Sequence, residues 1–137
     1  MTYIFDIDPV PCPRMVNSDR WNPSKAASRY FGFRNHLVSL ARVKGLDGLP
    51  DSLESLIFHI PMSGSWSREK QNAMRGTPHQ QTPDLDNLCK SFLDALCPTD
   101  QHIHTIRNMQ KCWADFGSIE LTIERENEMK HFQDRVA

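Results

Sequence analysis

Alternating apolar and polar positions mark two stretches of the chain as β-strands. They are YIFDID at residues 3–8 and SIELTIE within residues 118–125. Residues 53–62 and 102–113 are also expected to form strands, and ADFG between the last two strands has the composition of a hairpin turn. The pattern therefore predicts four strands spread over both halves of the chain.

Apolar residues at helical spacing mark the segments between these strands. Residues 83–96 carry one apolar stripe, and Pro83 suits the first helical turn. The stripe consists of Leu85, Leu88, Phe92, Leu93 and Leu96. Residues 25–45 carry a rougher stripe with Ser24 as the expected N-cap, and a short helical piece is expected at 67–74 within a long polar loop.

The order of these segments is βαβαββ, which predicts an α+β fold with one mixed sheet flanked by helices. The chain has 137 residues, the size of a single domain. We assign residues 1–125 to this domain and residues 126–137 to a charged tail, expected to be a frayed helix.

Composition excludes several classes of protein. No apolar run approaches the ~18 residues needed to cross a membrane, and the N-terminus lacks the features of a signal peptide. We therefore expect a cytoplasmic protein with no membrane partner, and reduced thiols at its four cysteines. A zinc site is a weaker alternative, because the spacing of its candidate ligands matches no familiar zinc module. Those ligands are Cys97, His102, His104 and Cys112.

Charge is unevenly distributed although the net charge is only −1. Residues 14–44 hold seven Lys and Arg against one acid, whereas the chain from Asp84 onward holds six Lys and Arg against ten acids. A basic half beside an acidic centre suits a polyanion held next to metal-binding carboxylates. Ordinary solvated surface is the alternative explanation of the same pattern.

The start of the helix at 83–96 raises a specific question, because Asp84 and Asp86 stand only two residues apart. In one explanation Asp84 caps the helix and Asp86 relieves the helix dipole, each contributing ~1 kcal/mol at best. In the other, Asp84 lies at the cap, only Asp86 is helical, and both carboxylates hold a divalent metal that removes their repulsion. Spacing alone does not choose between these explanations.

The segment PDLDNLCKSFLDAL, residues 83–96, is similar to the signature of the RusA family of Holliday junction resolvases. The resemblance extends to FDIDPVPCPRMVNSDRW before it, to the SWSREK loop typical of phage-type members, and to TDQHI with the strand after it. It covers about residues 3–125, nearly the whole chain. The chain departs from the family in having one acid at Thr99–Asp100 where many members have two, and in the spacing between Ile103 and Lys111.

The resemblance implies a small homodimer that cuts four-way DNA junctions symmetrically with Mg²⁺, or with Mn²⁺ as a substitute. By position, Asp84, Asp86 and Asp100 are the metal-binding and catalytic acids, and Lys90 is the catalytic lysine. Lys90 instead pairs with Asp86 or Asp94 if its role is only structural. Basic residues in the loops are expected to contact DNA phosphates. These are Arg14, Arg20, Lys25, Arg68, Lys70 and Arg75.

The expected function is Mg²⁺-dependent resolution of Holliday junctions in DNA recombination and repair. Two alternatives stay open: cleavage of other branched DNA such as flaps or forks, and junction binding without catalysis. Trp21 and Trp66 are candidates for stacking on exposed bases, with packing on the domain equally expected. His79 is interpreted as a loop histidine rather than a ligand, and the role of Lys111 stays unassigned.

Overall fold

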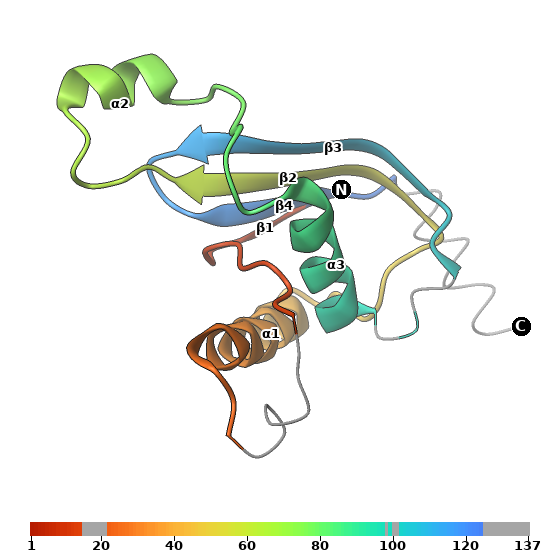
Figure 1. Ribbon diagram of the computed structural model, residues 1–137. Coiled ribbons are helices and arrows are strands. Elements are labelled where there is room, and N and C mark those ends of the chain that lie inside the picture. Colours follow the sequence, from red (N-terminus) through yellow and green to blue (C-terminus); the bar gives the residue numbers. More distant parts are fainter. Residues whose placement is uncertain (15–21, 98, 100–101, 125–137) are drawn as a thin grey trace, which may run out of the picture.

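The computed structural model describes residues 1–14, 22–97, 99 and 102–124, and these form a mixed β-sheet with two long helices on one of its faces (Figure 1). The predicted α+β domain is confirmed. The predicted tail, residues 126–137, lies outside the described residues.

The elements follow the predicted order, and the short helical piece expected at 67–74 is present. The elements are β1 (Thr2–Phe5), α1 (Lys25–Val43), β2 (Ser52–Pro61), α2 (Arg68–Met74), α3 (Leu85–Leu96), β3 (Thr105–Ala114) and β4 (Ser118–Thr122). Most boundaries lie within a few residues of the predicted ones, and two of the differences are informative. The first strand ends at Phe5 because the chain turns there, with the Ile7 amide donating to the Phe5 carbonyl at 2.9 Å. The third helix begins at Leu85, so Pro83 precedes the N-cap and is not in the first turn.

The four strands lie in the order β1-β4-β2-β3. β2 pairs with β3 in parallel and with β4 in antiparallel orientation. The predicted hairpin between the last two strands is therefore wrong, since β2 lies between β3 and β4. Local turn composition indicates that the chain reverses at this point, but only the register against β2 decides which strands become neighbours.

Alternation places one face of each strand in the core. Ile119 and Leu121 of β4 are fully buried, as is Phe58 of β2 apart from 1% of its surface. Phe92 of α3 packs edge-on against both Phe5 and Phe58, with ring centroids 6.1 and 6.4 Å apart. The helices α1 and α3 cover this face of the sheet (Figure 1), so α3 is held firmly on β1 and β2.

The short helix α2 stands apart from this core. It projects beyond the end of the sheet (Figure 1), and none of its residues is buried. Ser67 begins it by accepting a hydrogen bond from the Lys70 amide at 3.1 Å. The segment after α2 returns along the edge of β3 and leads directly into the start of α3.

Candidate active site

Asp84 occupies the N-cap position of α3 but does not cap the helix with its side chain. Its backbone is extended, with φ −69° and ψ 147°, and the side chain makes no capping hydrogen bond. Ser24, by contrast, caps α1 through a 3.1 Å bond from the Ala27 amide. The capping explanation of the acidic pair therefore fails for the Asp84 side chain, whose carboxylate is exposed and left without that backbone partner.

Asp86 lies in the first turn of α3 and is also exposed. Its Oδ1 accepts a hydrogen bond from the Asn87 amide at 2.9 Å. One residue at the cap and one inside the helix is the arrangement that the metal-binding explanation requires. Both carboxylates stand at the helix end where the backbone N–H groups favour negative charge.

A small cavity of about 360 Å³ opens beside Asp84. Its lining comes from the helix start and from the segment after β1, where the Cys12 amide donates to the Asn87 carbonyl at 3.3 Å. A larger cavity of about 870 Å³ lies between α1 and the β3–β4 connection and touches neither predicted acid. We place the candidate site at the smaller cavity, because Asp84 lines it.

Lys90 follows Asp86 by one turn but pairs with Asp94. Its Nζ lies 2.9 Å from Asp94 Oδ2, while the lysine side chain stays 61% exposed. The hydrogen bond with Asp94 raises the pKa of Lys90 above its ordinary value. Lys90 is therefore a fixed positive charge next to the site and not a proton acceptor near neutral pH.

The third predicted acid, Asp100, lies outside the described residues, and so does Arg20. The neighbours of Asp100 that are described, Thr99 and His102, follow the C-terminal end of α3. A helix of the length of α3 spans about 18 Å, so that end is distant from Asp84 and Asp86. Among the residues that the structure describes, no three His, Cys, Asp or Glu side chains form a metal-binding group.

The suggested zinc cluster does not assemble. Cys97 Sγ lies 3.8 Å from Nε2 of His102, but the same imidazole nitrogen is 2.9 Å from the Leu49 carbonyl oxygen. Cys112 lies elsewhere, with its Sγ 3.4 Å from His59 Nδ1 on the uncovered face of the sheet.

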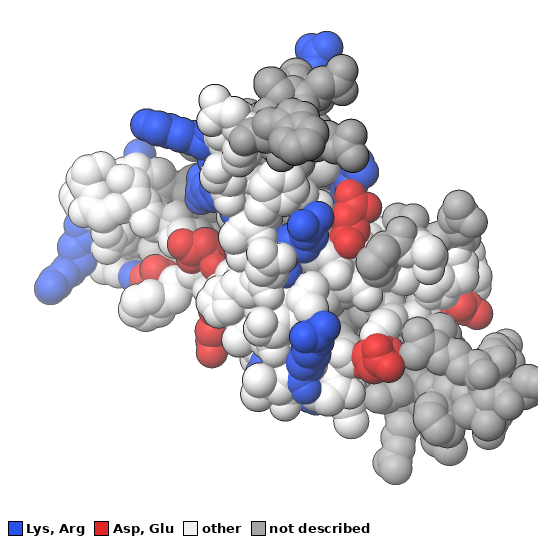
Figure 2. Space-filling view, turned by 90° about the horizontal axis from the view of Figure 1, so that it is seen from below, with Lys and Arg blue, Asp and Glu red and all other residues white. Residues whose placement is uncertain are grey.

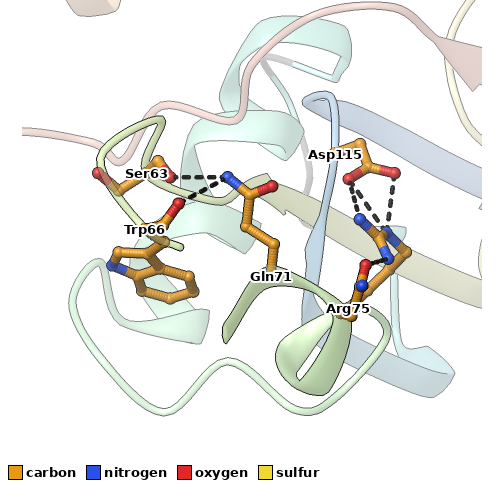
Figure 3. A network of polar contacts seen from close by, with 6 residues as sticks. Ser63, Trp66, Gln71, Arg75 and Asp115 are labelled. Atoms are coloured by element: carbon orange, nitrogen blue, oxygen red, sulfur yellow. Dashed lines mark hydrogen bonds and ion pairs between the residues drawn. The ribbon is translucent and has the colours of Figure 1, made fainter. Parts of the chain in front are cut away.

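The other basic residues predicted to contact DNA are exposed, but they differ in their partners. Arg14, Lys25 and Arg68 are exposed at the ends of loops or helices. Arg75 instead holds Asp115 with Nε 2.9 Å from Oδ2 and Nη2 2.9 Å from Oδ1 (Figure 3). Lys70 lies over the Trp66 ring, 4.1 Å from its centroid.

Among the described residues, the basic side chains do not form one continuous surface on the face that includes α1. Figure 2 shows Lys and Arg as separate patches, with carboxylates and uncharged surface between them. Trp66 is held by Trp113, with ring centroids 4.8 Å apart, and its carbonyl accepts a bond from Gln71 (Figure 3). Trp66 thus packs on the domain, and Trp21 lies outside the described residues.

Two residues near the site were underrated by sequence reasoning. His79 is only 4% exposed and stacks on Trp113 with ring centroids 4.3 Å apart. The Lys111 side chain reaches the loop before Asp84, where its amine donates to the Pro83 carbonyl at 2.8 Å. The alternation of β3 places Lys111 on the face that the helices cover. A lysine at such an inward position in the sequence pattern indicates a specific partner for its amine.

Comparison with known protein families now adds a decisive observation: residues 20–124 match the family described as endodeoxyribonuclease RusA. The chain belongs to the RusA family. The match includes Asp84, Asp86, Lys90 and Asp100, and it excludes Arg14. A search of curated proteins finds no match. The RusA family is a family of DNA endonucleases. Membership of this chain in the family supports hydrolysis of phosphodiester bonds and action on branched DNA.

No helix among the described residues is long and apolar enough to span a membrane.

Proposed function

We propose that this RusA-family chain is a Mg²⁺-dependent endonuclease that resolves four-way DNA junctions as a homodimer in the cytoplasm. The observation that carries the proposal is the Asp84 carboxylate, which stands at a helix N-terminus beside Asp86 without capping the helix. Two exposed carboxylates at one helix end repel each other, and a cation beside them would remove that repulsion. Capping by the Asp84 side chain does not explain the pair, because that side chain makes no capping hydrogen bond.

The available ligands suit magnesium. Mg²⁺ commonly binds one or two carboxylates and keeps several of its waters. Asp84 and Asp86 would supply the first ligands, and Asp100 is the predicted third. When bound, the ion would make a water nucleophilic and neutralise charge on the phosphate oxygens.

The contribution of Lys90 is electrostatic. Its raised pKa keeps the amine protonated, so it would stabilise a non-bridging phosphate oxygen in the transition state rather than remove a proton. The ion pair with Asp94 holds the amine on the same side of α3 as Asp86. Lys90 is exposed enough to exchange this partner for a phosphate when DNA binds.

Exposed cations elsewhere on the domain would hold the DNA backbone. Arg14, Lys25, Arg68 and Lys70 are the described candidates, and contacts of this kind position a duplex without reading its sequence. A homodimer presents two such sites related by a two-fold axis, which matches the approximate two-fold symmetry of a four-way junction.

A cleavage assay tests the proposal directly. A synthetic four-way junction incubated with the protein and Mg²⁺ should give paired nicks at symmetric positions on a denaturing gel. Asp84→Asn and Asp86→Asn should abolish the nicks while junction binding persists in a gel-shift assay. Asp6→Asn, which changes an exposed carboxylate at the larger cavity, is the matched control and should cut normally.

The membership of Asp100 in the site has its own test. Asp100 of the same protomer or of the partner subunit has to reach the N-terminal end of α3. Mixing Asp84→Asn protomers with Asp100→Asn protomers restores one intact site only if the acids come from different subunits. Recovery of nicking in the mixture would show a shared site, and continued inactivity would place all three acids in one chain.

The same assay distinguishes the alternative functions. Faster cutting of flaps or forks than of four-way junctions, at equal concentration, would reassign the substrate within branched DNA. Junction binding with neither cleavage nor Mg²⁺ binding would identify a non-catalytic junction-binding protein.

A further inference from the structure

Lys111 connects the sheet to the loop that carries the candidate metal ligands. It lies on β3 opposite Phe58 of β2, on the face that α3 covers. Its Nζ donates to the carbonyl oxygens of Gln81, at 2.5 Å, and Pro83, at 2.8 Å. Asp84 is the next residue after Pro83, so the amine holds the backbone directly before the first predicted ligand.

The backbone of Lys111 holds the same loop at a second point. The His79 amide donates to the Lys111 carbonyl at 3.0 Å. Two further bonds join the preceding residues to β3, from the Gly76 amide to the Trp113 carbonyl at 2.9 Å and from the Trp113 amide to the Thr77 carbonyl at 3.0 Å. From residue 80 the chain leaves the strand edge, and the Lys111 side chain continues the attachment up to Pro83.

We propose that Lys111 is a positioning residue for the metal site, acting through the backbone that sets the place of Asp84. This inference rests on the proposed function, because it assigns Lys111 a role toward the Mg²⁺ that the nuclease would use. Two of the three donors of the lysine amine already have carbonyl partners, and the residue is half-buried. Lys111 is therefore poorly placed to bind a DNA phosphate.

The charge of Lys111 makes the inference sharply testable. If the residue acted only as a nearby positive charge, its removal would strengthen Mg²⁺ binding, because like charges repel. If it positions Asp84, its removal weakens Mg²⁺ binding, because the ligand loses its fixed place. Supporting groups around metal ligands typically change metal affinity about 10- to 100-fold when they are lost. The two roles thus predict changes of opposite sign.

The experiment measures Mg²⁺ binding to the DNA-free protein by titration calorimetry, and the Mg²⁺ dependence of junction cleavage. Lys111→Met removes both hydrogen bonds at similar side-chain length, and Lys111→Arg keeps donors that can make them. Arg107→Met is the matched control, because Arg107 is a cation of the same strand that pairs at 3.4 Å with Glu54 on the surface. We expect Lys111→Met to raise the Mg²⁺ needed for half-maximal cleavage about tenfold, at unchanged junction affinity.

Lys111→Arg should restore most of the Mg²⁺ affinity, and Arg107→Met should leave it at the wild-type value. If Lys111→Met does not fold, Lys111→Gln offers an uncharged amide with two N–H donors on a shorter side chain and should give an intermediate affinity. Unchanged or tighter Mg²⁺ binding in the Met or Gln variant would overturn the inference, as would a loss confined to junction affinity. Failure of the wild-type protein to cut any branched DNA would refute the nuclease proposal instead, while the calorimetric comparison would still test Lys111.

Discussion

Lys90 Nζ lies 2.9 Å from Asp94 Oδ2, one helical turn further along α3. The pair holds the amine on the helix face that also carries Asp86, yet leaves it largely exposed. Its contribution to stability is small, a few tenths of a kcal/mol for a pair at this spacing. The arrangement keeps a protonated lysine close to the carboxylates without a large structural role.

This finding predicts different consequences for the two partners. Lys90→Met should reduce single-turnover cleavage of a junction by about 10²-fold or more, because a charge that stabilises the transition state is lost. Asp94→Asn should change the rate only a few-fold, since the ammonium group remains. Thermal melting should move little in either variant. Equal losses of rate in both variants would show that the ion pair itself, and not the lysine charge, matters.

The acids at the start of α3 predict an unusual response of stability. Asp84→Ala should leave the free energy of unfolding nearly unchanged or raise it without Mg²⁺, because the side chain does not cap and its repulsion of Asp86 disappears. Ser24→Ala is the comparison, and it should lower stability by about 1 kcal/mol through loss of a real cap. Urea denaturation measures both. A loss for Asp84→Ala as large as that for Ser24→Ala would revive the capping explanation.

The α2 segment predicts a contrast between two arginines. Arg75 is engaged by Asp115 and Asn72 (Figure 3), whereas Arg68 makes no hydrogen bond or ion pair with any described residue. Arg68→Ala should therefore weaken junction binding uniformly and reduce the slope of log affinity against log salt by about one. Arg75→Ala should change that slope less. Fluorescence anisotropy over a range of salt concentrations measures the slope for each variant. A larger change of slope for Arg75→Ala than for Arg68→Ala would indicate that DNA binds on the Asp115 side of α2.

His79 predicts a decrease in stability on the acid side of neutrality. Burial, and secondarily the charge of Lys111, lowers the pKa of His79 below its ordinary value of 6.5. The unfolded chain then binds a proton that the folded chain does not, so stability is fully present above about pH 6.5 and falls as the pH decreases toward the lowered value.

His79→Phe keeps the stacking on Trp113 and removes the titration. It also removes Nδ1, a buried atom that has no hydrogen-bond partner among the described residues. Melting temperatures between pH 5 and 8 should therefore fall less for the variant than for the wild type. A wild-type slope that persists in His79→Phe would assign the effect to another group.

Local sequence patterns predicted the elements well because each has a local cause. Ser24 begins α1, and the leucine stripe of residues 85–96 buries Leu88 against the sheet, both of which follow from nearby residues. The order of strands does not follow from local pattern, since it depends on how β4 inserts between β1 and β2. The expected hairpin failed for this reason.

The candidate site was predictable to the extent that its residues adjoin in sequence. Asp84, Asp86 and Lys90 share one helix start, and their spacing alone fixed their relative placement. Lys111 comes from a distant strand, and its contact with Pro83 depends on the register between β2 and β3. Contacts set by tertiary register carry no signature in one sequence, so its role could be found only in the structure.

The β3–β4 connection approaches the segment after β1 closely at Gly117 and Asp8. A Cβ added to Gly117 would lie 2.8 Å from the Cα of Asp8 and would collide with the Asp8 carboxylate. Because a backbone atom cannot move aside easily, Gly117→Ala should lower the free energy of unfolding by roughly 1–3 kcal/mol. Gly32→Ala is the opposite case, since Gly32 lies within α1 with nothing within 4 Å of an added Cβ. That change should raise stability by about 0.5–1 kcal/mol. Urea denaturation of both variants measures the difference, and a Gly117→Ala protein as stable as wild type would mean that the β3–β4 connection does not lie this close to Asp8.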